Sequence, residues 1–210
     1  MDHVVENSLL RCADTNRRRW LIATSIVGGA GGIATVVPFV DSFAPSEKAR
    51  AAGASVSVDL SQIAPGTMTT VAWRGMPVFV VNRTERMLKE VVAANEMVLD
   101  PFSTHPFTMP LPTYCTNRYR SRVAHPNFLV VMGVCTHLGC TPSQRFQSGP
   151  QPNLPNDWPV GFLCPCHGST YDLAGRVFKN KPAPQNLDVP RFQFDSPEQL
   201  SIGKDEHGEA

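Results

Sequence analysis

Two short segments of the chain, "VCTHLGCTPS" at 134–143 and "LCPCHGSTYD" at 163–172, concentrate the residue types that bind metals. Each holds two cysteines and one histidine, and together they take four of the six cysteines in the chain. Paired clusters of thiolate and imidazole donors are typical of a metal site. The candidate ligands are Cys135, His137 and Cys140 in the first box and Cys164, Cys166 and His167 in the second.

The spacing of these six residues bears on which metal they hold. Cys135-x-His137 and Cys164-x-x-His167 form a matched pair, with one cysteine and one histidine from each box. Structural zinc uses other spacings, and four zinc ligands would leave two cysteines idle. A pair of disulfides would leave the two histidines at matched offsets without a reason. The remaining interpretation is a [2Fe–2S] centre with two cysteines on one iron and two histidines on the other. Gly139 and Gly168 permit the tight turns that such loops need.

The composition limits the setting of these boxes. A chain of 210 residues is long enough for one domain with a real core. Its net charge of +1 gives no electrostatic footprint for nucleic acid, so we expect none as a partner. A charged fraction of 18% and 19 prolines favour a loop-rich, β-dominated domain.

Residues 20–40, "WLIATSIVGGAGGIATVVPFV", contain no charged residue and indicate a transmembrane helix. A helix of this length spans about 30 Å, the thickness of the bilayer hydrocarbon. Glycines at 28, 29, 31 and 32 are tolerated in membrane helices, where small residues permit close helix packing. A cleaved signal peptide is the alternative, but Pro38-Phe39-Val40-Asp41 follows instead of an Ala-x-Ala-like site, which favours an uncleaved anchor.

The charges beside this span predict its orientation. Arg11 and Arg17 to Arg19 precede it and Asp41 follows at once, which places residues 1–19 in the cytoplasm and sends the rest of the chain across the membrane. The stretch "NRRRWLI" at 16–22 also resembles a twin-arginine export signal. That route exports folded proteins, as a domain that acquires its cofactor in the cytoplasm requires.

After the anchor, residues 41–54 predict a flexible hinge linker, because they are small, polar and without apolar periodicity. The patterns that follow predict strands near 56–60, 68–73, 77–82 and 127–134, and a helix over 84–95 with Thr84 as its N-cap. We expect residues 100–127 to form a long ordered excursion rather than a core element. Residues 141–163, which include Trp158, predict a surface insertion.

The segments CTHLGC and CPCHGS resemble the two boxes of the Rieske iron–sulfur protein of the cytochrome bc complex, the quinol–cytochrome c reductase. The resemblance covers most of the chain, from the anchor and linker to the loop "KPAPQNLDVP". It implies an all-β Rieske-type antiparallel β-sandwich with a small cluster-binding subdomain, plus one N-terminal transmembrane helix. The Rieske [2Fe–2S] domain would cover 55–210 and its cluster-binding part 134–185.

The resemblance also implies roles for the site residues. Cys135 and Cys164 would ligate the inner iron of a [2Fe–2S] Rieske cluster, and His137 and His167 the outer iron. A disulfide between Cys140 and Cys166 would tie the two loops together, which suits the far side of the membrane.

Further residues match family positions around the cluster. The hydroxyl of Ser169 would bond to a cluster sulfide and that of Tyr171 to the thiolate of Cys135, and both bonds would raise the potential. Leu138 would shield the cluster and meet the quinol pocket. Pro182-Ala183-Pro184 would form a third covering loop, although Lys181 stands where the family usually has glycine.

The implied function is electron transfer in a respiratory ubiquinol–cytochrome c reductase of a bacterial inner membrane. His167 or His137 would take a proton from ubiquinol as the cluster takes one electron, which then passes to a cytochrome c-type haem. The implied partners are the cytochrome b subunit, the cytochrome c-type subunit, ubiquinol and the lipid bilayer, in a dimeric complex with the Rieske domain in the periplasm. Consecutive prolines at Ala51-Ala52 are expected to slow turnover, because the domain must swing between two sites, while the cluster spectrum stays intact.

Three alternatives remain open at this stage. They are the Rieske protein of a photosynthetic cytochrome b6f-type complex, a soluble Rieske ferredoxin, and a membrane-anchored structural zinc protein. The anchor and the extra cysteine pair argue against the ferredoxin. Cys12 and Cys115 are interpreted as free thiols, and His105 and His125 are given no metal role.

Overall fold

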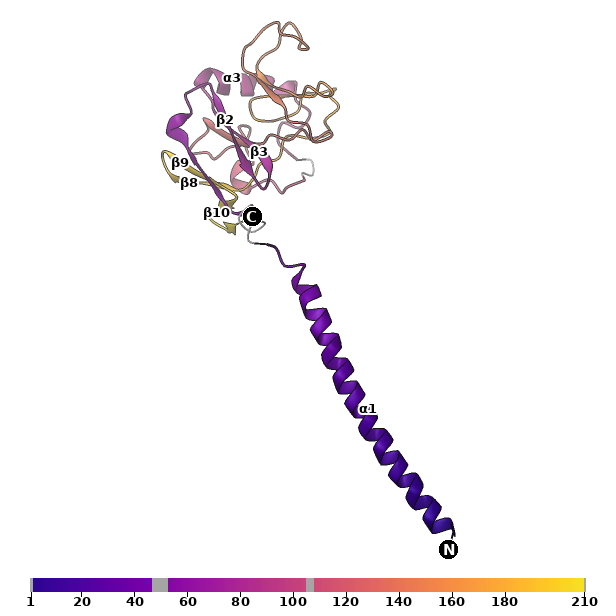
Figure 1. Cartoon of the computed structure of the whole chain (residues 1–210). Helices are drawn as coiled ribbons and strands as arrows, with labels where there is room; N and C mark the ends of the chain where they lie inside the picture. The colour runs from indigo at the N-terminus through magenta and orange to yellow at the C-terminus, as the bar shows by residue number, and fades with distance from the viewer. Residues whose placement is uncertain (1, 47–52, 105–107, 210) are drawn as a thin grey trace. The chain divides into compact units, whose positions relative to one another are not determined.

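The structure is a computed structural model that describes residues 2–46, 53–104 and 108–209, with side chains from Thr15 to Gly208 (Figure 1). The chain divides into two units, Met1–Arg50 and Ala51–Ala210. Each is described by itself. Residues 47–52, which make up the middle of the expected hinge, lie outside the described part of the chain.

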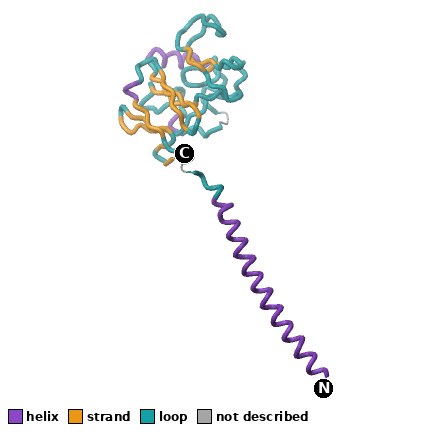
Figure 2. Tube along the Cα trace, in the orientation of Figure 1, coloured by secondary structure: helices purple, strands orange, loops and turns teal. Residues whose placement is uncertain are grey.

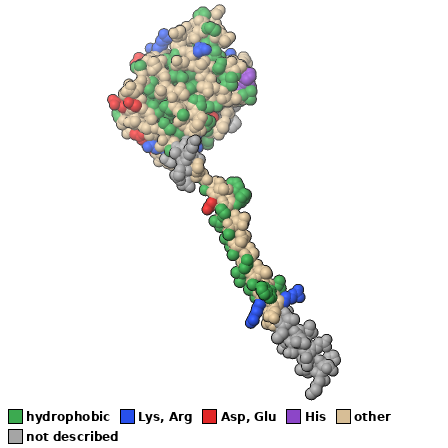
Figure 3. Space-filling model, in the orientation of Figure 1, with side chains coloured by type: hydrophobic (Ala, Val, Ile, Leu, Met, Phe, Trp, Pro, Cys, Tyr) green, Lys and Arg blue, Asp and Glu red, His purple; other side chains and the backbone are tan. Residues whose placement is uncertain are grey.

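The first unit is one helix, α1, which runs from Asp2 to Asp41 (Figure 2). Within it, Thr15–Asp41 is long and apolar enough to cross a membrane, with a mean hydropathy of 1.7. Its side chains are exposed, and the hydroxyl of Thr35 donates to the carbonyl of Gly31 at 2.9 Å, so this polar group is satisfied inside the helix. Basic side chains gather at one end of the described span and one acidic side chain lies at the other (Figure 3). The helix begins well before the expected span of 20–40, because nothing in the preceding segment breaks it.

Two antiparallel sheets form the body of the second unit. The first has the order β1-β9-β8, with β1 at Val56–Asp59, β8 at Phe192–Ser196 and β9 at Gln199–Ile202. The second has the order β2-β3-β4, with β2 at Met68–Trp73, β3 at Met76–Asn82 and β4 at Phe128–Met132. A two-residue turn joins β2 to β3, and both of its residues, Arg74 and Gly75, have positive φ. This is the turn that fits the twist of a hairpin.

The two sheets share one hydrophobic core. Val58 and Leu200 from the first sheet pack in the same cluster as Phe79 and Val131 from the second. Gly203, just after β9, lies so close to the second sheet that a Cβ there would stand 2.4 Å from Nε1 of Trp73. Two facing antiparallel sheets with a common core confirm the predicted β-sandwich.

Smaller elements complete the unit. A third sheet has the order β5-β6-β7 and a fourth pairs β10 with β11. Their bounds are β5 Ser143–Arg145, β6 Gly161–Leu163, β7 Thr170–Tyr171, β10 Lys204–Asp205 and β11 Gly208–Glu209. Short 3₁₀ turns are η1 at Leu60–Gln62, η2 at Ala94–Glu96 and η3 at Thr113–Cys115.

Helix α3, at Glu85–Ala93, confirms the predicted helix and its N-cap. The hydroxyl of Thr84 accepts a hydrogen bond from the Met87 amide at 3.3 Å. Met87 and Val91 are buried against Leu173 and Ala174, which follow the second box. The apolar face of the helix therefore supports the segment that carries half of the candidate ligands.

Two expectations about loops were wrong in part. The excursion at 100–127 contributes to the core, since Cys115 and Arg120 are fully buried. The insertion at 141–163 begins and ends in β5 and β6, and Trp158 inside it is only 3% exposed. Nε1 of Trp158 donates to the carbonyl of Arg145 at 3.1 Å. Burial of single side chains leaves no periodic pattern in the sequence. These side chains fix their segments to the domain one by one, through hydrogen bonds to backbone carbonyls.

Candidate metal centre

The two boxes fold into loops of the same design. In the first, the amide of Cys135 donates to the Cys140 carbonyl at 2.7 Å and that of Gly139 donates back to Cys135 at 2.9 Å. In the second, the amide of Cys164 donates to the Ser169 carbonyl at 2.7 Å and that of Gly168 donates back to Cys164 at 3.0 Å. Each loop is therefore closed by the same pair of backbone hydrogen bonds, counted from its first cysteine.

Glycine is required at one position of each loop. Gly139 has a φ of +83° and Gly168 a φ of +73°, in the left-handed region that side chains disfavour. The prediction of tight turns at these two glycines is confirmed. The first loop leaves the end of β4, and the second joins β6 to β7. The ends of strands in two different sheets thus hold the two loops in place.

The four cysteines of the boxes divide into two pairs. Cys140 and Cys166 form a disulfide with a Cα–Cα distance of 6.6 Å, as the resemblance implied. Cys135 and Cys164 are free thiols, each 2% exposed. Burial and the neighbouring Cys135 side chain raise the pKa of the Cys164 thiol. Although the sulfurs of Cys140, Cys164 and Cys166 lie within 4.8 Å of one another, they are not a ligand set, because two of them are bonded to each other.

The two histidines face each other at the ends of their loops. The ring centroids of His137 and His167 are 4.8 Å apart and the rings are perpendicular. Nδ1 of His137 is buried and has no hydrogen-bond partner within the described part of the chain. A buried nitrogen of this kind is costly unless something binds its lone pair. Two buried thiols and two imidazoles therefore fit the donor set of a Rieske cluster, in which Nδ1 of His137 would be free to bind iron.

Tyr171 lies against the first of these thiols. Its hydroxyl donates to Sγ of Cys135 at 3.2 Å and accepts from the Thr136 amide at 3.2 Å. Burial, together with the adjacent Cys135, raises the pKa of this phenol. The phenol therefore stays protonated at physiological pH and keeps the proton that it donates to sulfur.

Ser169 and the third loop meet beside the boxes. The buried hydroxyl of Ser169 accepts a hydrogen bond from the Ala183 amide at 3.0 Å, so its own proton is available to another acceptor. Ala183 is buried while the prolines on both sides are exposed. The substitution of glycine by Lys181 does not strain the loop, because the left-handed residue here is Asn180, with a φ of +58°. Asparagine tolerates that conformation better than most residues.

One residue of the site was missed by sequence reasoning. Thr136 lies between two candidate ligands, and its hydroxyl donates to the carbonyl of Gln185 at 2.6 Å. It thereby joins the first box to the third loop. Leu138, in contrast, is 70% exposed.

Cys115 and His125, which lie outside the boxes, belong to other parts of the second unit. Cys115 is a buried free thiol, which confirms that prediction, and burial raises its pKa to about 12. His125 stacks on Phe194 with ring centroids 4.0 Å apart. The side chain of Cys12 and the whole of His105 lie outside the described residues.

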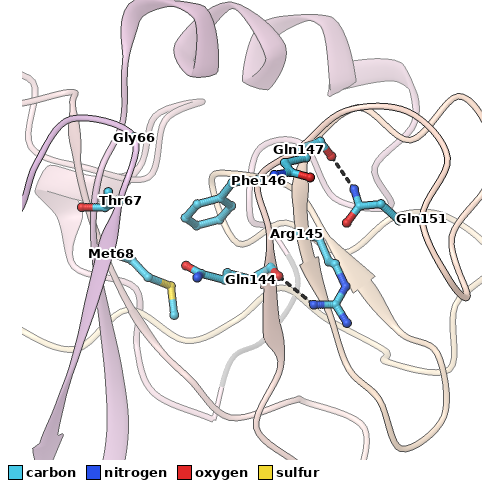
Figure 4. Close-up of a pocket in the computed structure, with 8 residues that line it drawn as sticks. All are labelled: Gly66, Thr67, Met68, Gln144, Arg145, Phe146, Gln147 and Gln151. Carbon is cyan, nitrogen blue, oxygen red and sulfur yellow. Dashed lines mark hydrogen bonds between the residues drawn. The ribbon is translucent and has the colours of Figure 1, made fainter.

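A cavity of about 450 Å³ lies between the segment Gly66–Met68 and β5 with the loop that follows it (Figure 4). Its described lining holds none of the candidate ligands. Its polar side chains are satisfied locally, since Arg145 donates to the Gln144 carbonyl at 3.0 Å and the Gln151 amide donates to the Gln147 carbonyl at 2.5 Å. This cavity is therefore separate from the metal centre.

Comparison with known proteins agrees with this geometry. Residues 115–193 match the family model of the Rieske [2Fe–2S] domain, so the fold and the site define a Rieske iron–sulfur protein. Residues 12–46 match the model described as the ubiquinol–cytochrome c reductase Fe–S subunit TAT signal.

Similar proteins extend over nearly the whole chain. It is 48% identical over 190 residues to the ubiquinol–cytochrome c reductase iron–sulfur subunit of Allochromatium vinosum, covering 90% of this chain and 89% of the relative. Its identity to the subunit of the same name from Bradyrhizobium diazoefficiens is 38% over 189 residues, or 90% of this chain and 94% of the relative. The chain belongs to the family of ubiquinol–cytochrome c reductase iron–sulfur subunits.

Proposed function

We propose that this chain is the electron-transfer subunit of a quinol–cytochrome c reductase and takes one electron from ubiquinol. The observation that carries the proposal is the set of candidate metal donors on the two loops. Two matched loops, joined by the Cys140–Cys166 disulfide, present two buried free thiols and two facing imidazoles. Family membership gives this site its physiological setting.

In this proposal Cys135 and Cys164 ligate the inner iron, and His137 and His167 the outer iron. When bound, the cluster supplies a one-electron carrier whose oxidised form acidifies the ligand imidazoles. The buried Nδ1 of His137 is the nitrogen that would face iron, which leaves Nε2 to exchange protons with solvent or substrate.

His167 is the better placed of the two to meet the quinol, because it is the more exposed. Its free imidazole nitrogen would accept a hydrogen bond from the quinol hydroxyl and then the proton, while the electron that leaves the quinol would pass to the bound cluster. Leu138, which is exposed and follows His137 in the chain, offers the apolar contact that a quinone ring requires. Tyr171 donates to Sγ of Cys135, and Ser169 would donate its own proton to a cluster sulfide. Both bonds would favour the electron-rich reduced state.

The anchor and the export signal support a membrane location for the subunit. Helix α1 holds the chain in a bacterial inner membrane, with its N-terminus in the cytoplasm and the Rieske domain in the periplasm. The partners are a cytochrome b subunit, whose haem takes the second electron of the quinol, and a cytochrome c-type subunit, which receives the first. Two such assemblies form the dimeric complex.

Electron paramagnetic resonance of the full-length chain during a redox titration tests the proposal. A reduced-state signal with a low average g value at a positive midpoint potential is expected. The same signal at a clearly negative midpoint would indicate a ferredoxin-like carrier instead. A protein without the signal, in which metal analysis finds zinc, would overturn the proposal.

A further inference from the structure

Arg120 connects the excursion at 100–127 with segments that flank the boxes. It is fully buried and has a φ of +49°, an unusual conformation for arginine. Its guanidinium donates to backbone carbonyls that lie more than fifty residues further along the chain. An arginine held in this way points to a specific task, because burial of its charge is costly.

The contacts of Arg120 join two segments that flank the metal centre. Nη1 donates to the carbonyls of Ala174 and Gly175, at 2.9 and 3.3 Å, and Nη2 donates to the carbonyl of Leu187 at 2.5 Å. The amide of Leu187 in turn donates to the Gly175 carbonyl at 2.8 Å. The turn after the second box and the end of the third loop are thus bound to one rigid fork.

The first of these segments positions Tyr171. The turn at Asp172–Gly175 closes a narrow hairpin in which Tyr171 bridges Val177, and the Asp172 amide donates to the Arg176 carbonyl at 2.9 Å. Tyr171 lies at the start of this hairpin, with its hydroxyl on Sγ of Cys135. A shift of the turn would move the tyrosine ring relative to the sulfur.

The second segment supports the same bond from the other side. Two residues before Leu187, the Gln185 carbonyl accepts the hydroxyl proton of Thr136, whose amide donates to the Tyr171 hydroxyl. Four residues before Leu187, the Ala183 amide donates to Ser169. Both segments that Arg120 binds therefore lead directly to the groups that surround the thiols.

We infer that Arg120 is a positioning residue for the hydrogen bond between Tyr171 and Cys135, and that it thereby helps to set the potential of the cluster. This inference rests on the proposed function, because it requires a cluster on Cys135. Lysine in place of Arg120 keeps the positive charge but cannot bind three carbonyls with a planar fork. The substitution therefore separates geometry from charge.

The test is a double-mutant cycle on the full-length, cluster-loaded chain. Iron and acid-labile sulfide are measured first, followed by midpoint potentials of the wild type, Arg120→Lys, Tyr171→Phe and the double variant. Arg120→Lys is expected to lower the potential in the wild-type background and to change it by less than half as much in the Tyr171→Phe background. Equal shifts in both backgrounds, or no shift at all, would overturn the inference.

Arg122→Lys is the matched control, because it lies two residues away and donates to the Phe192 carbonyl and to Glu206 instead. Its potential is expected to equal that of the wild type, and an equal drop in both lysine variants would count against a specific role for Arg120.

Should Arg120→Lys fail to fold, Gly175→Ala perturbs the same contact with the arginine in place. Its Cβ would stand 3.2 Å from Nη1 of Arg120, at a φ of +71°. The same dependence on Tyr171 is expected for this variant, and a potential equal to that of the wild type would overturn the inference. A wild-type chain without a cluster would overturn the proposed function and the inference together, whereas a loaded wild type with additive variants would overturn the inference alone.

Discussion

Replacement of Tyr171 by phenylalanine is expected to lower the midpoint potential of the cluster by about 40 mV. This value follows from the energy of one hydrogen bond, converted to a potential for a one-electron reduction. The bond from the Tyr171 hydroxyl to Sγ of Cys135 is 3.2 Å long and fully buried. Reduction adds negative charge to the cluster and makes this sulfur a better acceptor. The bond therefore stabilises the reduced state more than the oxidised state.

The magnitude comes from typical hydrogen-bond energies. A hydrogen bond to a charged group contributes roughly 1.5–3 kcal/mol. If about 1 kcal/mol of this appears only on reduction, the change is about 40 mV, because 1.4 kcal/mol corresponds to about 59 mV for one electron. The phenyl ring fills the same space, so the core around it is preserved.

The assay is a redox titration of the full-length chain, followed by electron paramagnetic resonance, with iron content matched between the samples. Tyr114→Phe is the matched control: its hydroxyl accepts from the Phe192 amide at 3.0 Å, within the sandwich, and touches neither box. An unchanged potential in Tyr171→Phe, or an equal drop in both variants, would refute the reasoning.

Three further predictions concern stability and reactivity. Alanine at both Cys140 and Cys166 removes a disulfide with a sequence separation of 26. The free energy of unfolding, measured in urea, should fall by about 3.5 kcal/mol, because the unfolded chain gains the entropy of an open loop. A loss below ~1 kcal/mol would contradict this expectation. Glu206 accepts from Arg122 at 2.7 Å, which lowers its pKa to about 2. A carboxyl with a depressed pKa in the folded state stabilises the fold above its ordinary pKa near 4.5, and this contribution is lost as the pH falls from there towards 2. Arg122→Gln should therefore flatten that part of the curve of unfolding free energy against pH, measured by circular dichroism. An unchanged slope would show that the pair is not coupled to folding. Burial raises the pKa of Cys115 to about 12, so iodoacetamide at pH 8 should label this thiol only when urea unfolds the protein. Mass spectrometry of peptides measures the labelling. Rapid labelling of the folded protein would disprove the burial of Cys115.

The local features of the site were predictable from the sequence because they depend on short spacings. The matched boxes, their two glycines and the N-cap at Thr84 each involve residues fewer than six positions apart. The apolar span before Asp41 and the alternating strands are likewise local patterns with a known period. The pairing of Cys140 with Cys166 came from resemblance to a family, since spacing alone left other interpretations open.

The tertiary structure alone decided which distant residues support these loops. Arg120 reaches carbonyls 54 to 67 residues away, and Thr136 reaches Gln185 across 49 residues. Cys115, at the centre of a segment interpreted as peripheral, is part of the main core. A polar side chain that donates to a distant backbone carbonyl leaves no periodic pattern in the sequence. Its partner is determined by the packing of two sheets and not by its neighbours in the chain. The sequence therefore determined the candidate ligands and their loops, while the packing of the domain determined what holds them in register.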